Sequence, residues 1–256
     1  MCLLLIALHA HPEYRLIIAA NRDEFYDRPA APAHFWKEAP SLLAGKDLRG
    51  GGAWLGITKK GRVAALTNVR NPSLFKDGAP TRGKLVSSFL KEDESPPDYL
   101  NKIDRNGRDF NGFNLIAGDV AHLWWYSNRS DKVVAVPSGV HGLSNHFLDT
   151  PWPKVTFGKR GLSKLLSNEE DPSPLLFFDL LSDRTCPFDG DLPDTGVGLE
   201  WERILSPVFI KSPTYGTRCS TVITIDNRGG VTFLEKTFYP ENKPPTLIRY
   251  EFEIEG

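Results

Sequence analysis

Cys2 is the residue whose position most favours chemistry in this sequence. A small side chain after Met1 generally allows the initiator methionine to be removed, which would leave a thiol and an α-amine on one residue. An α-amine has a pKa of about 7.7–8.0, so much of it can act as a base near neutral pH. A nucleophile activated by its own terminal amine is an established arrangement. The alternative is a buried cysteine that packs at the start of a strand.

A polar cluster, Asn21-Arg22-Asp23-Glu24, follows the apolar run Tyr14–Ala20. If that run pairs antiparallel with Leu3–Leu8, the cluster lies near residue 2. An arginine beside a nucleophilic cysteine favours the thiolate, and Asp23 could hold the ammonium group or relay its proton. The alternative is a solvated turn.

Two asparagines and a late arginine complete the set of candidate site residues. Asn68 ends a predicted strand, and Asn145 lies in Gly142-Leu143-Ser144-Asn145. Side-chain amides are good donors to an oxyanion, although asparagine is also a routine turn residue. Arg218 enters a predicted strand, from which it could reach a site or pair with an acid.

Metal and nucleotide sites find no support in the sequence. The histidines form no HExxH motif, and turns account for the close pairs His9 with His11 and His141 with His146. Gly50-Gly51-Gly52 lacks the following lysine and hydroxyl residue of a phosphate loop. We therefore predict no metal and no cofactor.

Composition limits the partners and the compartment. Lys and Arg number 31 against 32 Asp and Glu, and this near-zero net charge argues against a nucleic-acid surface. Three cysteines are too few and too scattered for a disulfide framework, which predicts a reducing, cytoplasmic location and leaves association with an organelle open. No apolar run reaches the roughly 18 residues of a membrane span.

The elements that must position these residues are mostly strands. Short apolar runs bounded by turn residues predict strands. They are Leu3–Leu8, Tyr14–Ala20, Ala53–Thr58, Arg62–Asn68, Gly112–Gly118, Ala121–Tyr126, an edge strand Val133–Val136, Ser220–Asp226, Val231–Lys236 and Ile248–Glu255.

Helices are predicted mainly in the middle of the chain. They are one broken segment over Arg82–Leu90 and Pro97–Asp104, a helix over Trp152–Leu166, and a short helix from Ser173 to Leu181. Asp183–Gly198 reads as a surface loop. Strands, then helices, then strands favour an α+β fold with antiparallel sheets, and no linker divides residues 1–256, which predicts one domain.

Several motifs together resemble the NRDE family, which includes the transport and Golgi organization proteins. The resemblance covers residues 1 to about 235, and one departure from the family pattern is Ala53, where the family usually carries threonine. The matching motifs are Met1-Cys2, Ala19-Ala20-Asn21-Arg22-Asp23-Glu24-Phe25, Gly51-Gly52-Ala53-Trp54-Leu55-Gly56, Ala64-Ala65-Leu66-Thr67-Asn68, Asn111-Gly112-Phe113-Asn114-Leu115, Gly142-Leu143-Ser144-Asn145, Thr150-Pro151-Trp152 and Tyr215-Gly216-Thr217-Arg218.

This family is similar, more distantly, to N-terminal-nucleophile amidases of the choloylglycine hydrolase type. That similarity implies a four-layer αββα sandwich. It also implies a catalytic set at the matching positions, although Arg22 and Asp23 are adjacent here and separated in the amidases. The set is Cys2, Arg22, Asp23, Asn68, Asn145 and Arg218.

The resemblance leaves two functions open, both with a small-molecule partner. One is a cysteine-dependent hydrolase of amide or thioester bonds. The other is a non-catalytic protein that binds haem or an acyl lipid in the same cleft, since family members are linked to haem trafficking and to lipid homeostasis. A scaffold without a ligand is disfavoured, because burying so many polar residues has a cost. The oligomeric state does not follow from the sequence.

Overall fold

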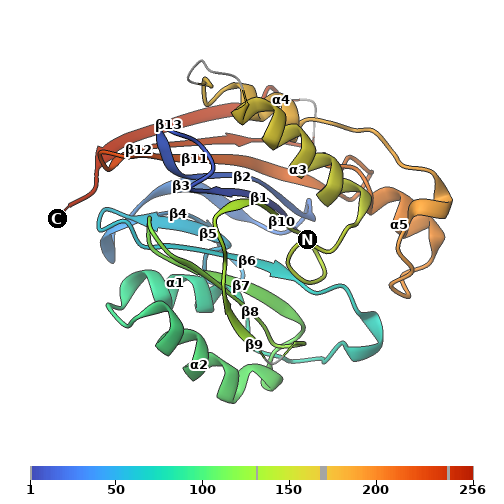
Figure 1. The fold of residues 1–256 in the computed structure, drawn as a ribbon. Coiled ribbons are helices and arrows are strands. Elements are labelled where there is room, and N and C mark those ends of the chain that lie inside the picture. The colour runs from blue at the N-terminus through green and yellow to red at the C-terminus, as the bar shows by residue number, and fades with distance from the viewer. Residues whose placement is uncertain (1, 131, 168–171, 241–242, 256) are drawn as a thin grey trace.

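The computed structural model describes residues 2–130, 132–167, 172–240 and 243–255. Two antiparallel sheets stack in the middle of the molecule and helices cover their outer faces, so that four layers follow one another (Figure 1). The predicted α+β class and the αββα arrangement are therefore found. In the described chain no helix is both long enough and apolar enough to cross a bilayer.

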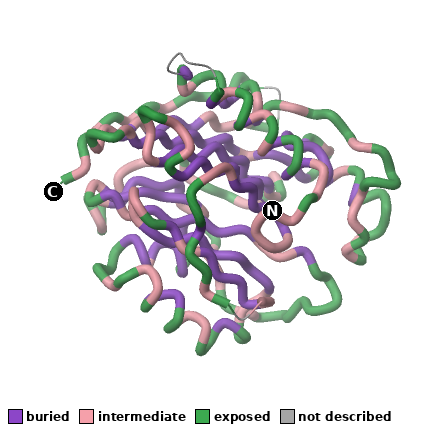
Figure 2. The backbone as a smooth tube through the Cα atoms, in the orientation of Figure 1, coloured by how far each residue is buried: buried purple, intermediate pink, exposed green. Residues whose placement is uncertain are grey.

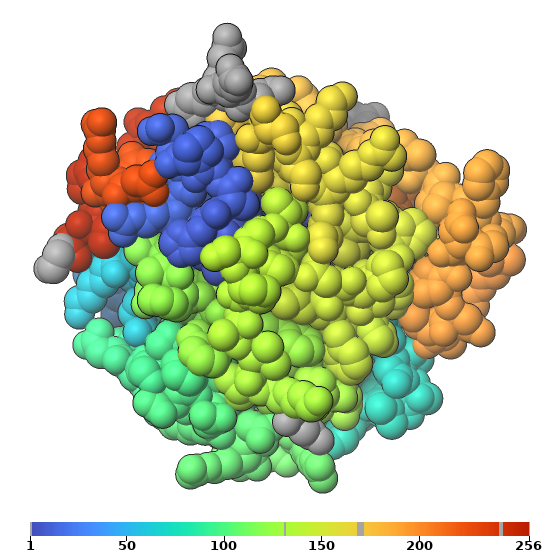
Figure 3. Space-filling view, in the orientation of Figure 1, coloured from blue at the N-terminus to red at the C-terminus, as the bar shows by residue number. Residues whose placement is uncertain are grey.

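The first sheet has six strands in the order β10-β1-β2-β11-β12-β13. It joins the first residues of the chain to its last strands, so segments from both ends of the sequence lie side by side. Figure 3 shows blue N-terminal residues next to orange and red C-terminal ones. The strands are β1 (Cys2–Leu8), β2 (Tyr14–Phe25), β10 (Gly139–Leu143), β11 (Tyr215–Asp226), β12 (Gly230–Thr237) and β13 (Thr246–Glu253).

The second sheet has seven strands in sequence order from β3 to β9. Each strand pairs with the next one along the chain, as short connections favour. The predicted edge strand, now β9, does lie at the edge. The strands are β3 (Ala30–Trp36), β4 (Ala39–Asp47), β5 (Leu55–Thr58), β6 (Val63–Asn68), β7 (Phe113–Gly118), β8 (Leu123–Ser127) and β9 (Lys132–Ala135).

Helices cover the two outer faces. α1 (Gly83–Lys91) and α2 (Pro96–Asn106) pack on the seven-stranded sheet, and α3 (Pro153–Leu166) and α4 (Leu176–Leu181) pack on the six-stranded one. α5 (Leu199–Leu205) follows the long loop after α4. The segment predicted as one broken helix forms two helices, because the Ser95 hydroxyl caps α2 by accepting a hydrogen bond from Asp98 N.

The apolar core lies in three layers that follow from the burial of alternate strand faces. Between the sheets, Leu4, Ile6 and Ile18 pack with Ile57 and Ile116. The outer faces of the sheets pack against the helices in two further clusters. Figure 2 shows the buried residues concentrated in the strands and the exposed ones on helices and loops.

Three strands and one helix have no counterpart among the sequence predictions: β3, β4, β10 and α5. Asn21-Arg22-Asp23-Glu24 forms no solvated turn, because β2 continues to Phe25 and Asn21, Arg22 and Asp23 are buried. The pairing on which that argument depended is confirmed: β1 and β2 are antiparallel, with Cys2 opposite Arg22.

Candidate functional site

A row of side chains crosses the six-stranded sheet at the end where β1 begins. Cys2 pairs with Arg22, Arg22 pairs with Cys219 on β11, and Cys219 pairs with Thr237 on β12. Side chains directly opposite each other in a sheet point to the same face. All four residues line one cavity of about 400 Å³ between the two sheets.

The seven-stranded sheet and the loops around it close the other side of this cavity. Ala31 and Gly45 contribute from β3 and β4, and Asn68 contributes from the end of β6. The segment before α1 contributes Thr81 and Arg82. The cavity therefore lies where segments from most of the chain meet, with the Cys2 thiol at one of its walls.

The Cys2 thiol is buried, with 7% of the residue exposed. Burial raises the pKa of this thiol, and the charge of Arg22 acts in the opposite direction. Arg22 alone therefore does not produce the stabilised thiolate that the sequence led us to expect. Burial also raises the pKa of the Cys219 thiol, to well above its usual value. Met1, whose removal the sequence predicts, lies outside the described residues.

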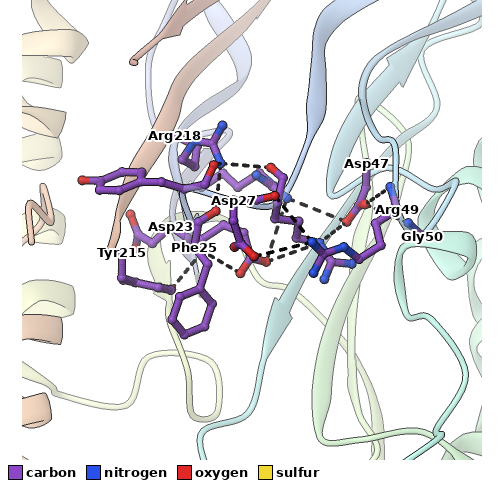
Figure 4. A network of polar contacts seen from close by, with 12 residues as sticks. Asp23, Phe25, Asp27, Asp47, Arg49, Gly50, Tyr215 and Arg218 are labelled. Carbon is purple, nitrogen blue, oxygen red and sulfur yellow. Dashed lines mark hydrogen bonds and ion pairs between the residues drawn. The ribbon is translucent and has the colours of Figure 1, made fainter. Parts of the chain in front are cut away.

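Two carboxylates balance the charge of Arg22. Its Nη2 atom lies 3.9 Å from Glu24 Oε2 and 3.8 Å from Asp47 Oδ2. Arg28 shares the same acids, with Nε 2.7 Å from Asp47 Oδ2. Asp47 also accepts hydrogen bonds from the backbone N–H groups of Arg49 and Gly50 (Figure 4). These contacts connect the end of β2 to the other sheet.

Asp23 is buried and lies next to the cavity. Its Oδ1 atom accepts a hydrogen bond of 2.7 Å from the Thr217 hydroxyl. Its backbone carbonyl accepts one of 2.9 Å from the Tyr215 hydroxyl (Figure 4). Burial raises the pKa of the Asp23 carboxyl, and the positive charge of Lys154 opposes that effect. Asp23 is therefore held in place by β11, the neighbouring strand.

Arg218 occupies a β-bulge of β11. Thr217 pairs with Asp23 and Cys219 pairs with Arg22, so Arg218 has no partner in the register. Its Nη1 atom donates to the backbone carbonyls of Phe25, Tyr26 and Arg28 at 2.9, 3.2 and 3.0 Å. Arg218 lines the cavity, and these bonds fix the chain that follows β2.

Asn68 lines the cavity, whereas Asn145 is not among its lining residues. The Asn145 amide donates to the backbone carbonyl of Asn68 at 3.0 Å, and the Ser144 hydroxyl donates to the backbone carbonyl of Cys2 at 3.2 Å. The turn after β10 thus holds both Cys2 and Asn68. Five of the six predicted residues line the cavity, and Asn145 contacts one of them, Asn68, through its backbone carbonyl.

A charged cluster fixes that turn. Asp149 has a positive φ of 59°, and it accepts hydrogen bonds from the Gly142 N–H, from His141 and from Lys159. Burial raises the pKa of the Asp149 carboxyl, but the hydrogen bonds outweigh burial and lower it to about 2. The hydrogen bond between His141 and Asp149 raises the pKa of the His141 imidazole. Asp149 therefore stays ionised and keeps the turn folded.

Two cations near the site were missed from the sequence. Lys154 is buried in the first turn of α3, donates to the Leu205 carbonyl at 2.9 Å, and acts electrostatically on Asp23 and Cys2. Burial lowers the pKa of Lys154 to about 8. The sequence signal that could have identified Lys154 is a lysine on the apolar face of the predicted helix, next to Val155. The second cation, Arg82, stands at the start of α1, where the helix dipole disfavours positive charge.

A shallow apolar groove of about 680 Å³ adjoins the cavity. Its walls include Phe25, Leu74, Trp201 and Tyr215, and large parts of Phe25 and Leu74 are exposed. Groove and cavity share five lining residues: Glu24, Asn68, Phe75, Arg82 and Asn111. A molecule that reached Cys2 could therefore extend an apolar part into the groove.

Comparison with known sequences gives matches over nearly the whole chain. The model of a family described as Transport and Golgi organisation 2 matches residues 1–240. The Transport and Golgi organization protein 2 homolog of Bos taurus is 39% identical and covers 93% of each chain. The Transport and Golgi organization 2 homolog of Mus musculus is 37% identical and covers 100% of each chain.

Comparison with solved structures identifies the fold. A mutant of the conjugated bile acid hydrolase from Clostridium perfringens, with alanine in place of its second residue, superposes with a TM-score of 0.52. It covers 100% of this chain and 97% of that one at 9% identity. Another variant of this hydrolase superposes with a TM-score of 0.52 at 9% identity, and the match covers 99% of this chain and 97% of that one. At such identity the likeness shows the fold alone, which is the predicted N-terminal-nucleophile hydrolase fold.

Proposed function

Because this chain belongs to the Transport and Golgi organisation 2 family and has the N-terminal-nucleophile hydrolase fold, we propose that it is a hydrolase. The nucleophile is the Cys2 thiol, and the substrate carries an amide or thioester carbonyl. The observation that carries the proposal is the single cavity that Cys2 shares with Arg22, Asp23, Asn68 and Arg218. The mature chain must then begin at Cys2.

The reaction follows from these residues. The α-amine of the mature Cys2 accepts the thiol proton, and the sulfur attacks the substrate carbonyl carbon. The carbonyl electron pair moves onto oxygen, where the Asn68 amide stabilises the charge. When the carbon–nitrogen or carbon–sulfur bond breaks, the ammonium group returns the proton to the leaving group. Water then hydrolyses the acyl-cysteine and releases a carboxylic acid.

The other residues position this machinery. Arg22 favours the thiolate against the effect of burial, and Asp23 holds the terminal amine. Asn145 keeps Asn68 in place through its bond to the Asn68 carbonyl. Arg218 fixes the backbone after β2 through its three carbonyl contacts. We therefore assign Asn145 and Arg218 a positioning role.

The test combines intact mass with turnover. We expect protein from the native host to lack Met1 and to gain an acyl group on Cys2 when mixed with acyl thioesters of N-acetylcysteamine or with fluorogenic N-acyl amides. Cys2→Ala should lower turnover by about a thousandfold or more, as loss of a nucleophile does, and Cys2→Ser should keep a trace. Cys186→Ala, which changes an exposed thiol, is the control. Unchanged turnover in Cys2→Ala would reject the proposal.

The apolar groove favours one second candidate, a carrier that binds haem or an acyl lipid without reaction. A carrier needs the groove but not the thiol. In that case Cys2→Ala should keep ligand affinity within about threefold, and the wild-type protein should form no acyl adduct. Trp201→Ala, on the groove wall, should weaken binding instead.

A further inference from the structure

Five cationic residues line the cavity beside Cys2, and four of them are held by other groups of the protein. These are Arg22, Arg28, Lys46 and Arg218; the fifth is Arg82. Arg22 and Arg28 share the carboxylates of Glu24 and Asp47.

Lys46 and Arg218 are held in different ways. The Lys46 Nζ atom lies 2.5 Å from Glu38 Oε1. Arg218 donates to three backbone carbonyls. Lys46 is therefore balanced by an acid. Arg218 is held by backbone acceptors at Nη1 alone, and its buried Nε has no hydrogen-bond partner among the described residues.

Arg82 is half-buried, and it has neither the acid that Arg22, Arg28 and Lys46 have nor the three carbonyl acceptors of Arg218. Its Nη1 atom donates to the Gly112 carbonyl at 3.0 Å. Within the described part of the chain, no carboxylate lies within 4 Å of its guanidinium group, which carries five N–H donors. Burial lowers the pKa of Arg82, and Glu24 opposes this only from a distance. A cation that is partly dehydrated and without an acid carries a cost that an anionic ligand would remove.

The place of Arg82 in the fold adds to this argument. Arg82 is the N-cap residue of α1, a nine-residue helix whose first N–H groups have no partner inside the helix. The positive end of the helix dipole and the guanidinium group therefore lie together, although each disfavours the other. Thr81 and Gly83 line the same cavity. An anion is the group that both would stabilise.

Arg82 also lies where the cavity meets the apolar groove, because it lines both. Its charge is close enough to interact with the Cys2 sulfur. A ligand group at Arg82 would thus share one cavity with a carbonyl that Cys2 attacks. The apolar part of the same ligand could then extend along Phe25 and Trp201.

From this arrangement we infer that Arg82 is a specificity residue that binds an anionic oxygen group of the substrate, a carboxylate or a phosphate. This assignment rests on the proposed function only in taking Cys2 as the reacting group. It predicts substrates that carry a negative charge a few bonds from the scissile carbonyl.

The first test needs no substrate. Iodoacetate and iodoacetamide have similar size and differ in charge, so the ratio of their alkylation rates reports the local electrostatics of a thiol. Peptide mass spectrometry gives the rate with iodoacetate divided by the rate with iodoacetamide for Cys2. In the same sample it gives this ratio for the exposed Cys186, which serves as internal reference. Arg82→Gln should lower the Cys2 ratio by about fivefold to tenfold and leave the Cys186 ratio unchanged.

Matched variants make this test decisive. Lys84→Gln removes an equal charge from an exposed position two residues along α1 and should keep the wild-type ratio. Arg82→Lys keeps the charge but loses the planar fork, so it should keep part of the preference. A Cys2 ratio in folded Arg82→Gln within about twofold of wild type overturns the inference. If Arg82→Gln does not fold, Arg82→Met takes its place, and a Cys2 ratio within about twofold of wild type again overturns the inference.

A second measurement is independent of thiol reactivity. Calorimetry on Cys2→Ala compares 4-phenylbutyrate and 3-phenylpropyl phosphate with the neutral 4-phenylbutyramide. We expect at least one anion to bind about tenfold more tightly than the amide, and Arg82→Gln in that background to remove the difference. The anion that binds more tightly shows whether Arg82 prefers a carboxylate or a phosphate. Equal affinity for all three probes overturns the inference.

The outcomes for Arg82 and for the proposed hydrolase are separable. An anion preference that depends on Arg82, found together with normal turnover in Cys2→Ala, would retain the binding site and reject the catalytic role of Cys2. Loss of turnover in Cys2→Ala without any anion preference would do the opposite.

Discussion

Arg22 and Cys2 face each other across β1 and β2, and their charges are coupled in the wall of the cavity. Burial raises the pKa of the thiol, while the guanidinium group stabilises the thiolate. The carboxylates of Glu24 and Asp47 weaken this second effect, because they share the same arginine. The reactivity of Cys2 therefore depends on a balance that single substitutions can shift.

Arg22→Gln tests this balance. Removal of the positive charge should raise the pKa of the Cys2 thiol further, so the pH midpoint of its alkylation by iodoacetamide should rise by about one unit. The control is Arg49→Gln, which changes an exposed arginine outside the cavity. A midpoint that does not move on Arg22→Gln would show that the two groups are uncoupled.

Lys154 provides a second prediction at the scale of one residue. Its pKa is lowered by burial from 10.5 to about 8. Between these values the unfolded chain binds a proton that the folded chain does not bind, so stability rises with pH in this window. Relative to Lys154→Met, the wild-type protein should gain about 3 kcal/mol of unfolding free energy between pH 8 and 10.5.

Urea unfolding at several pH values measures this gain. Lys164→Met removes an exposed lysine from the same helix and corrects for the general effect of losing a surface charge. A difference between wild type and Lys154→Met that stays constant from pH 7 to 10.5 would contradict the assigned burial of the charge.

At the scale of elements, α1 is placed by its contact with the glycine segment before β5. A Cβ atom on Gly52 would lie 2.2 Å from the Gly83 carbonyl carbon, and the Ala53 N–H donates to the Gly83 carbonyl at 3.1 Å. Gly52 therefore serves as a close-packed support for the helix start that carries Arg82.

Gly52→Ala should push α1 away from this support. The added methyl group meets backbone atoms that cannot rotate aside, so we expect a loss of about 1–3 kcal/mol in unfolding free energy. Gly190→Ala is the matched control, because a Cβ atom there meets nothing within 4 Å. Equal stability of the two variants, measured by urea unfolding, would show that α1 is not held by this contact.

At the scale of the whole molecule, the two sheets are joined by a buried carboxyl group as well as by apolar packing. Glu235 of β12 accepts a hydrogen bond of 2.7 Å from the Ala33 N–H of β3, and its other oxygen accepts one from Thr221. Burial raises the pKa of Glu235. Its charged form is therefore disfavoured inside the sandwich.

This raised pKa gives stability a dependence on pH. Between the usual glutamate value of about 4.3 and the raised value, the folded protein binds more protons than the unfolded chain, so its stability falls as pH rises. Glu235→Gln keeps a similar shape without this proton. The unfolding free energy of Glu235→Gln minus that of wild type should therefore increase from about pH 4 to pH 7.

Urea unfolding of both proteins over this range measures the increase. Glu251→Gln, at an exposed position of β13, serves as control. A difference that does not change with pH would mean that Glu235 is as well hydrated in the folded protein as in the unfolded chain.

The sequence by itself determined the central hairpin and most of the strands. Short apolar runs and tight turns are local properties, so Leu3–Leu8 and Tyr14–Ala20 indicated an antiparallel pair, and that pair brings Arg22 opposite Cys2. β10 was missed because Gly139–Leu143 has two glycines and little strand preference. It becomes a strand through its pairing with β1.

Only the tertiary structure decided which side chains share the cavity. Asn145 and Asn68 are 77 residues apart, and their bond depends on a turn held by Asp149. Arg82 became a candidate only through its surroundings, because burial and the absence of an acid depend on packed neighbours. The position of Lys154 on an apolar helix face was a sequence signal, but its contacts and its lowered pKa follow from the packing. Local propensity specifies strands and turns, but the charge state and reach of a side chain depend on contacts between distant segments.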